Sequence, residues 1–284
     1  MKKVYGVIGD PIEHSLSPVM HNAAFEALGL DAIYLAFRVP LQNVGNAIRG
    51  AESLGFGGLN VTVPLKEAAM RFVRPDELSK RIGAINTINF EAPEGEPNAF
   101  NTDGIAAVRV LKENVGSLTK KNVLMLGAGG AAKAIAFYLQ NEGARLVILN
   151  RTAKRAKELM ERLLSSGGAG EVAWGGLEEL PTRIKEADIL INATSVGMYP
   201  NVEETLVTAD LMHKDLVVFD VVYNPVETRL LREAKKAGVR HRIDGVKMLV
   251  YQGAEAFKIW TGISPPIDVM ERAVRERLGG GMEK

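Results

Sequence analysis

The sequence contains no cysteine among its 284 residues. Disulfide bridges, thiolate metal sites and cysteine nucleophiles are therefore excluded as sources of stability or chemistry. An excess of charge of either sign is also missing, because 35 Lys and Arg stand against 34 Asp and Glu, a formal net charge of +1 at pH 7. A chain so nearly neutral offers no overall attraction for nucleic acid or for an anionic membrane surface.

Long hydrophobic runs are missing as well. The most apolar long stretch, Val123–Leu139, contains Lys133 and is shorter than the ~20 apolar residues that a membrane span needs. Asp10 ends the N-terminal apolar run too early for a secretory signal. Hydrophobic residues make up 46% and charged residues 24%, which is typical of a globular protein. We therefore expect a soluble, cytoplasmic protein with one large or two ordinary domains.

The first hundred residues alternate short apolar runs with helical patterns. The apolar runs predict strands at Val4–Ile8, Ala32–Val39, Leu59–Val63 and Ile85–Phe90. Apolar residues at helical spacing predict helices from Ser17 to Gly29, over Leu41–Leu54, and from Pro64 through Val73. Polar turn formers at residues 91–99 predict a hairpin tip or a loop.

The alternation continues through the rest of the chain. Strands are expected at Asn122–Leu126, Arg145–Leu149, Ile189–Asn192, Leu216–Val221 and Arg240–Ile243, with helices over Ile105–Glu113 and Ala131–Asn141. Two helices are expected within Gly245–Leu278, and the sequence leaves open which lobe they pack on. Such alternation predicts an α/β fold with parallel strands and right-handed crossovers. We place domain boundaries near Asp103 and Val239, which gives segments 1–103, 104–238 and 239–284.

A glycine-rich turn lies between a predicted strand and a predicted helix. Its residues fit the pattern G-x-G-x-x-A, in which the first Gly makes the turn, the second lets backbone approach a pyrophosphate, and the small third residue permits helix–strand packing. A glycine turn without a ligand is the alternative, but the strand–turn–helix setting favours a dinucleotide site. The residues predicted to line it are Gly127, Ala128, Gly129, Gly130 and Ala131.

The next strand indicates which dinucleotide binds. An NAD site places Asp or Glu about 20 residues after the glycine turn, to accept from the ribose hydroxyls. Here the strand ends in Asn150, Arg151 and Thr152, followed by Lys154 and Arg155, with no carboxylate. Guanidinium, ammonium and hydroxyl donors suit the 2′-phosphate of NADP(H). The alternative is that Lys154 and Arg155 belong to a solvated helix face.

Short polar side chains follow the strands of the first lobe. They are Ser15 and Ser17, Asn60 and Thr62, Asn86 and Thr87, and Asn101, Thr102 and Asp103. For each residue taken alone, a role as a helix cap or turn residue is the favoured explanation. Ligands of α/β sheets bind outside the carboxyl ends of the strands, so together these residues predict a site for a small polyhydroxylated ligand.

Lys66 and Asp103 are the ionisable members of this set. Lys66 is expected in the first turn of a helix, where the dipole disfavours a cation, so no stability rule explains it. We therefore expect a role in proton transfer. Asp103 suits either catalysis or the N-cap of the helix that follows. The four histidines contain no H-E-x-x-H pattern, and we expect no metal site and no histidine triad.

With these residues the chain resembles the shikimate dehydrogenase family nearly from end to end. The matching motifs are SLSP at Ser15–Pro18, NVTVPLK at Asn60–Lys66, GAINT at Gly83–Thr87, NTDG at Asn101–Gly104, GAGGAA at Gly127–Ala132, NRT at Asn150–Thr152, NATSVGM at Asn192–Met198, D-x-x-Y at Asp220–Tyr223 and YQG at Tyr251–Gly253.

The resemblance implies a fold and an activity. The fold is an N-terminal α/β substrate lobe and a Rossmann-type doubly wound parallel-sheet NADP domain, with a cleft between them and the C-terminal helices packed on the substrate lobe. The activity is the reversible NADP(H)-dependent reduction of 3-dehydroshikimate to shikimate, in the biosynthesis of chorismate and aromatic amino acids. No nucleic-acid or membrane partner is expected, and a homodimer stays an open alternative.

The resemblance also implies residue roles. Lys66 and Asp103 are the catalytic pair. Shikimate contacts are expected from Ser15, Ser17, Asn60, Thr62, Lys66, Asn86, Asp103, Tyr223 and Gln252. Besides the glycine turn and Asn150–Arg155, cofactor contacts are expected from Glu77, Thr194, Ser195, Val221, Gly245 and Met248.

Three other functions remain as alternatives. One is a quinate/shikimate dehydrogenase of broader range, although the absence of an acid after Asn150 favours the strict shikimate branch. Another is a non-catalytic NADP sensor, which would be expected to lose Lys66 or Asp103. The third is another two-lobed α/β reductase, against which the polar residues at the strand ends argue.

Overall fold

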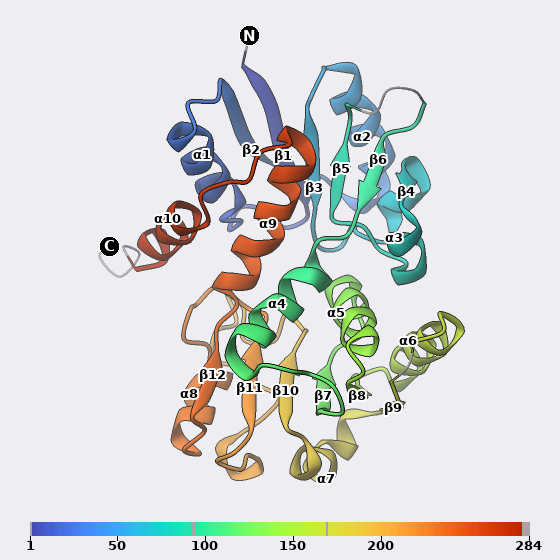
Figure 1. Cartoon of the computed structure of the whole chain (residues 1–284), viewed down its shortest axis with the longest axis vertical. Helices are drawn as coiled ribbons and strands as arrows, with labels where there is room; N and C mark the ends of the chain where they lie inside the picture. The colour runs from blue at the N-terminus through green and yellow to red at the C-terminus, as the bar shows by residue number, and fades with distance from the viewer. Residues whose placement is uncertain (1, 92–94, 169, 280–284) are drawn as a thin grey trace. The chain divides into compact units, whose positions relative to one another are not determined.

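The computed structural model describes residues 2–91, 95–168 and 170–279. The chain divides into two compact units, one of Met1–Asp103 with Leu249–Lys284 and the other of Gly104–Met248. Each unit contains one six-stranded sheet (Figure 1). The divisions fall inside two helices, α4 (Asp103–Val115) and α9 (Val246–Thr261).

The first unit contains a mixed sheet. In spatial order its strands are β2 (Ala32–Arg38), β1 (Lys3–Gly9), β3 (Gly58–Val61), β5 (Thr87–Asn89), β6 (Asn98–Phe100) and β4 (Arg74–Pro75). β1 is parallel to β2 and β3, whereas β5 is antiparallel to β3 and β6. The expected parallel sheet is therefore wrong for this half, because strands joined by a short hairpin must run antiparallel. Residues 91–99 were expected to form a hairpin tip or a loop. The strands β5 and β6 on either side of residues 92–94 pair antiparallel, and residues 92–94 themselves lie outside the described residues.

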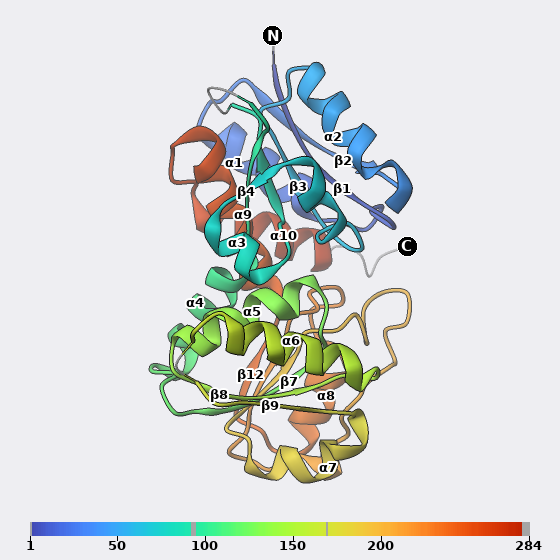
Figure 2. The ribbon, with the colours of Figure 1, turned by 90° about the vertical axis from the view of Figure 1, so that its right-hand side faces the viewer.

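Helices cover both faces of this sheet. They are α1 (Ser17–Ala27), α2 (Val44–Ser53), α3 (Glu77–Ile82), α9 and α10 (Ile267–Gly279), with 3₁₀ turns at Leu41–Asn43 and Ala68–Phe72. Figure 2 shows α2 on one side of the strands and α1 and α9 on the other. Val44 and Ile48 of α2 pack with Leu59 of β3 in one core cluster. On the opposite face, Trp260 of α9 packs against Tyr5 of β1.

The helix expected from Pro64 through Val73 is wrong. Residues 63–67 form turns, and only Ala68–Phe72 is helical, as a 3₁₀ helix. The Lys66 carbonyl accepts a hydrogen bond from the backbone N–H of Ile85, at 3.0 Å. This carbonyl therefore accepts a long-range hydrogen bond in place of the bond from the N–H four residues later that an α-helix would require. The argument that placed Lys66 in a first helical turn therefore does not hold.

The second unit contains a fully parallel sheet. Its strands, in spatial order, are β12 (His241–Ile243), β11 (Val217–Asp220), β10 (Ile189–Asn192), β7 (Asn122–Leu126), β8 (Arg145–Leu149) and β9 (Val172–Gly175). Numbered along the chain within this sheet, the reverse order reads 3-2-1-4-5-6, which is that of a dinucleotide-binding fold. The order reverses between β7 and β10, and this switch point is where ligands bind in such sheets.

Helices line both faces of the parallel sheet as well. They are α4, α5 (Gly130–Asn141), α6 (Ala153–Ser165), α7 (Leu180–Arg183) and α8 (Arg229–Lys236), with short 3₁₀ turns at Leu177–Glu179, Ile184–Glu186 and Ala209–Leu211. Figure 2 shows α5 and α6 along one face and α7 and α8 on the other. In neither unit does a described helix have both the length and the hydrophobicity to cross a membrane.

Candidate active site

The first unit brings Lys66 and Asp103 together. Lys66 lies in the turn after β3, and Asp103 is the first residue of α4. The Lys66 Nζ lies 2.5 Å from Asp103 Oδ2, and the two side chains are 13% and 6% exposed. An ion pair this enclosed loses much of its hydration and adds little net stability. Its retention points to chemistry rather than to folding.

Asn86 holds the other oxygen of Asp103. Its Nδ2 donates to Asp103 Oδ1 at 2.9 Å and to the Thr102 hydroxyl oxygen at 2.9 Å. Its Oδ1 accepts from the backbone N–H of Thr102, a group that can only donate, so the direction of the amide is determined. The recorded partners of the Asp103 carboxylate are thus Lys66 and Asn86, and the N-cap alternative does not account for them.

Gln252 joins this group from α9, near the other end of the chain. Its Oε1 lies 3.3 Å from Asn86 Nδ2, and its backbone carbonyl accepts from the Thr102 hydroxyl at 2.9 Å. Thr102 therefore lies between two predicted substrate residues. It was predicted as one of the polar strand-end residues of the ligand site, although it was not among the expected shikimate contacts.

Asn60 lies behind Asn86 rather than beside the ion pair. Its Oδ1 accepts from the Tyr34 hydroxyl at 2.7 Å, and its Nδ2 donates to the Asn86 carbonyl at 2.9 Å and to Thr87 Oγ1 at 3.1 Å. Thr87 Oγ1 in turn donates to Asn86 Oδ1 at 3.0 Å. The amide of Asn60 thus holds Asn86 in place, and its direct contact with substrate stays a prediction.

Tyr34 is a residue of this network that the motifs did not indicate. It is fully buried, and burial raises the pKa of its hydroxyl well above the usual value, while a hydrogen bond with Ser17 opposes that rise. Ser17 is therefore linked through Tyr34 and Asn60 to Asn86. Because Tyr34 lies within an apolar strand, only the tertiary structure reveals this connection.

The other predicted substrate residues lie in three further loops. Ser15 precedes α1, and its Oγ accepts from the Ser17 backbone N–H at 3.4 Å. Thr62 directly follows β3, with its methyl group 2.5 Å from where a Cβ on Gly9 would lie. Tyr223 lies in the second unit, three residues after β11.

The glycine turn of the second unit fits a dinucleotide phosphate. Gly127 has φ +114°, and a Cβ there would lie 2.8 Å from the Ala193 carbonyl oxygen, so the turn requires glycine. No described residue lies within 4 Å of the point where a Cβ on Gly129 would be, and no described side chain caps the start of α5. The helix N-terminus is therefore open to an anion, which its N–H groups and dipole favour. Gly130 is the first residue of α5, and Ala128 and Ala131 flank it.

The predicted 2′-phosphate residues follow β8. Arg151, Lys154 and Arg155 are exposed, and none of them pairs with a carboxylate within the residues that the structure describes. The Asn150 side chain donates to the Thr152 carbonyl at 3.0 Å, which shapes the turn into α6. Three exposed cations at a strand end suit a phosphate monoester.

The remaining predicted cofactor residues are divided between the units. Thr194 and Ser195 lie in the loop after β10, and Val221 follows β11. Gly245 follows β12, where a Cβ would lie 2.4 Å from the Val221 carbonyl oxygen, and Met248 is buried in α9. Glu77 lies in the first unit at the start of α3, with its carboxylate 2.5 Å from Lys80 Nζ.

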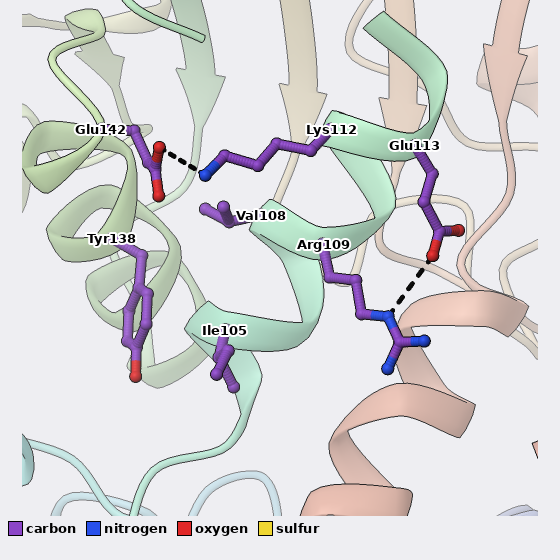
Figure 3. A pocket seen from close by; sticks show the side chains of 7 residues that line it. All are labelled: Ile105, Val108, Arg109, Lys112, Glu113, Tyr138 and Glu142. Carbon is purple, nitrogen blue, oxygen red and sulfur yellow. Dashed lines mark hydrogen bonds and ion pairs between the residues drawn. The ribbon is translucent and has the colours of Figure 1, made fainter. Parts of the chain in front are cut away.

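A groove on the second unit lies apart from these residues. It has a volume of about 510 Å³ and lies between α4 and α5, lined by Ile105, Val108, Arg109, Lys112, Glu113, Tyr138 and Glu142. Figure 3 shows its two ion pairs, Lys112 with Glu142 and Arg109 with Glu113. It contains no predicted site residue.

Comparison with known families covers most of the chain. Residues 7–88 match the shikimate dehydrogenase substrate binding domain, residues 109–234 match shikimate / quinate 5-dehydrogenase, and residues 245–275 match the shikimate 5′-dehydrogenase C-terminal domain. The chain belongs to the shikimate dehydrogenase family. The three matches follow one another along the chain, so the resemblance drawn from the motifs is confirmed.

Individual members of the shikimate dehydrogenase family are similar over their whole length. A shikimate dehydrogenase (NADP⁺) of Methanosarcina barkeri is 52% identical over 280 residues, which are 98% of this chain and 99% of the relative. A crystal structure of a shikimate dehydrogenase with NADP⁺ has a TM-score of 0.90 and 44% identity, covering 98% of this chain and 96% of that one. The Thermus thermophilus enzyme, solved with NADP(H) and shikimate, has a TM-score of 0.84 and 38% identity, over 96% and 99% of the two chains.

Proposed function

We propose that this protein is an NADP(H)-dependent shikimate dehydrogenase, which interconverts 3-dehydroshikimate and shikimate in the biosynthesis of chorismate and aromatic amino acids. The observation that carries the proposal is the enclosed pair of Lys66 and Asp103, 2.5 Å apart and oriented by Asn86. The three relatives described above are named for this activity. The first unit binds the substrate and the second unit binds the nucleotide.

Lys66 and Asp103 carry the proton chemistry. When bound, NADPH supplies the hydride that reduces the substrate ketone. The Lys66 ammonium stabilises the negative charge that develops on the ketone oxygen and donates a proton to it. Asp103 accepts a hydrogen bond from Lys66, which orients the ammonium, and its carboxylate is available to a ring hydroxyl. In the oxidative direction the same pair accepts the hydroxyl proton.

Polar groups around this pair select the substrate. Ser15, Ser17, Thr62, Asn86, Gln252 and Tyr223 are proposed contacts to the hydroxyl and carboxylate groups of shikimate. They are uncharged, and they combine donors with acceptors, as recognition of several hydroxyl groups requires. Asn60 contributes by fixing Asn86.

The second unit selects NADP(H) over NAD(H). Backbone N–H groups at the start of α5 bind the pyrophosphate, and Arg151, with Lys154 and Arg155, binds the 2′-phosphate. No carboxylate follows β8 among Asn150–Arg155, so the acceptor that an NAD ribose needs is missing there.

One spectrophotometric assay tests this function. Formation of NADPH is followed with shikimate and NADP⁺. Quinate then replaces shikimate in one assay, and NAD⁺ replaces NADP⁺ in another, where NADH is the product. We expect the highest kcat/KM for shikimate with NADP⁺. Quinate is the second candidate substrate, because the family matched by residues 109–234 includes quinate in its description. A higher kcat/KM for quinate, or for NAD⁺, would overturn the assignment.

The cytoplasmic location and the oligomeric state stay predictions.

A further inference from the structure

A buried carboxylate in the second unit is not used by the proposed chemistry. Asp220, the last residue of β11, is 0% exposed. No lysine, arginine or histidine in the described part of the chain forms an ion pair with it. Burial raises the pKa of Asp220 to about 6, against the effect of three hydrogen bonds. Because an enclosed, unpaired carboxylate is costly, folding alone does not explain this residue.

The three donors to Asp220 come from three different segments of the second unit. Oδ1 accepts from Asn192 Nδ2 at 2.9 Å and from the Val222 backbone N–H at 3.1 Å, while Oδ2 accepts from Thr228 Oγ1 at 2.6 Å. Asn192 ends β10, Val222 follows β11, and Thr228 caps α8. One carboxylate thus ties together the carboxyl ends of two neighbouring strands.

Asn192 extends this connection through the loop after β10. Its Oδ1 accepts from Thr194 Oγ1 at 2.6 Å and from the Thr194 backbone N–H at 3.2 Å. Its Nδ2 also lies 3.2 Å from the Val196 carbonyl oxygen. The conformation of residues 193–196 therefore depends on the side chain that Asp220 holds.

Close backbone contacts carry the connection to the neighbouring strand ends. The Ala193 carbonyl oxygen lies 2.8 Å from the point where a Cβ on Gly127 would be. The carbonyl oxygens of Val221 and Val222 lie 2.4 and 2.7 Å from the corresponding point on Gly245. The loops after β7, β10, β11 and β12 therefore pack as one set, and Asp220 with Asn192 forms its hydrogen-bonded centre.

We propose that Asp220 is a positioning residue for the nicotinamide half of bound NADP(H). The inference rests on the proposed function. In this sheet order the two halves of a dinucleotide bind on opposite sides of the switch point. The glycine turn and the cations after β8 serve the adenosine half, so the loops after β10, β11 and β12 serve the other half. Asp220 is enclosed and acts through the backbone of residues 193–196 and 221–222.

A comparison of two ligands tests this assignment. Adenosine 2′,5′-bisphosphate represents the adenosine half alone, and NADPH represents the whole dinucleotide. The Kd of NADPH is measured from its fluorescence, and the Kd of the bisphosphate is measured by calorimetry. We expect Asp220→Ala to raise the Kd of NADPH at least about tenfold, because bonds to a charged group are lost. The Kd of the bisphosphate should stay within about twofold of the wild-type value.

Further variants distinguish weaker NADPH binding from a general loss of folding. Asp220→Asn keeps the shape, and Asn192→Ala breaks the same connection while leaving the carboxylate, so both should weaken NADPH binding selectively. Asp215→Asn is the matched control, because this exposed aspartate lies just before the other end of β11. It should change neither Kd.

Two outcomes would overturn the assignment. One is an unchanged Kd of NADPH in folded Asp220→Asn and Asn192→Ala, and the other is equal weakening of both ligands. If the wild-type protein binds NADPH but does not reduce 3-dehydroshikimate, the proposed function fails while the ratio of the two Kd values still decides the role of Asp220.

Discussion

At the scale of single residues, the direction of one amide governs the candidate active site. The backbone N–H of Thr102 forces Asn86 to present its oxygen there, so the Asn86 amino group must face Asp103. Each carboxylate oxygen of Asp103 then accepts from one donor, Oδ1 from Asn86 and Oδ2 from Lys66. Replacing Asn86 would therefore disturb the proposed catalytic pair without removing either member.

Replacement of Lys66 tests the catalytic assignment. Lys66→Ala should lower kcat at least ~10²-fold with little change in KM, because the ammonium interacts most strongly with the charge of the transition state. Steady-state kinetics measure both constants. Lys235→Ala is the control, since Lys235 is 68% exposed and its Nζ lies 3.9 Å from the exposed Glu227, and it should keep the wild-type kcat. A Lys66→Ala enzyme with near-normal kcat would contradict the assignment.

His21 has an unusual environment for a titratable residue. The side chain is fully buried, and neither ring nitrogen has a hydrogen-bond partner among the residues that the structure describes. It stacks on Tyr34 with ring centroids 4.3 Å apart and lies near Phe257. Burial lowers the pKa of His21 from 6.5 to about 3, so the folded protein keeps this ring neutral.

This environment predicts a component of acid sensitivity. Between pH 6.5 and about 3 the unfolded chain binds a proton at His21 that the folded chain does not, so stability falls as pH falls. Each pH unit below 6.5 removes up to about 1.4 kcal/mol. His21→Phe should show a smaller loss of unfolding free energy between pH 6.5 and 4.5, measured by urea denaturation. His241→Gln, at an exposed position, should keep the wild-type slope. An equal slope in His21→Phe would refute the prediction.

At the scale of elements, the N-terminus of α5 raises the question of why glycine stands at position 129, directly before the helix. Gly129 has φ −85°, which any residue can adopt, so its backbone conformation does not require glycine. None of the described residues occupies the space of a side chain there. We therefore predict that glycine at this position allows a ligand to approach the helix N–H groups.

Gly129→Ala separates ligand approach from folding. The variant should fold with a stability change of only about 0.5 kcal/mol, while the Kd of NADPH should rise at least about tenfold as phosphate hydrogen bonds are lost. Fluorescence titration measures that Kd. Gly50→Ala, in α2 with equally open space, should leave NADPH binding unchanged. Wild-type affinity in Gly129→Ala would show that backbone does not approach the phosphate there.

At the scale of the whole molecule, the two ends of the chain build one core. Trp260, from α9, lies 5.2 Å from the Tyr5 ring and donates through Nε1 to the Ile88 carbonyl at 2.8 Å. Its indole is 4% exposed and fills the space above Gly58. The first unit is therefore completed only when the C-terminal helices pack against strands formed more than 150 residues earlier.

Truncation of Trp260 tests this dependence. Trp260→Ala should lower the unfolding free energy by about 3–5 kcal/mol, the cost of emptying an aromatic site in a core. Circular dichroism in urea follows the transition without relying on tryptophan fluorescence. Trp174→Ala is the control, because Trp174 on β9 is 36% exposed, and its effect should be near 0.5 kcal/mol. Similar losses in both variants would argue against a shared core.

Local sequence determined the elements and motifs whose signals lie within a few residues. Strands β7, β8 and β10 were predicted with their observed bounds, because each is a short apolar run in a fully parallel sheet. The glycine turn was likewise predicted from spacing alone, since its function depends on the backbone directly around it. The pairing of Lys66 with Asp103 was expected from the resemblance to the family, whereas the residues alone indicated only that both belong to the polar set at the strand ends.

Tertiary structure decided what depends on partners far along the chain. The Lys66 carbonyl bonds to Ile85 instead of extending a helix, and the β5–β6 hairpin makes the first sheet mixed. Short elements such as α3, β4, β6 and β9 were not predicted, because an element of so few residues gives too weak a periodic pattern of apolar side chains. The hydrogen bonds from Tyr34 through Asn60 to Asn86, and those around Asp220, also required the fold. Periodicity reports which face of an element is buried, whereas hydrogen-bond partners are set by which elements the folded chain brings into contact.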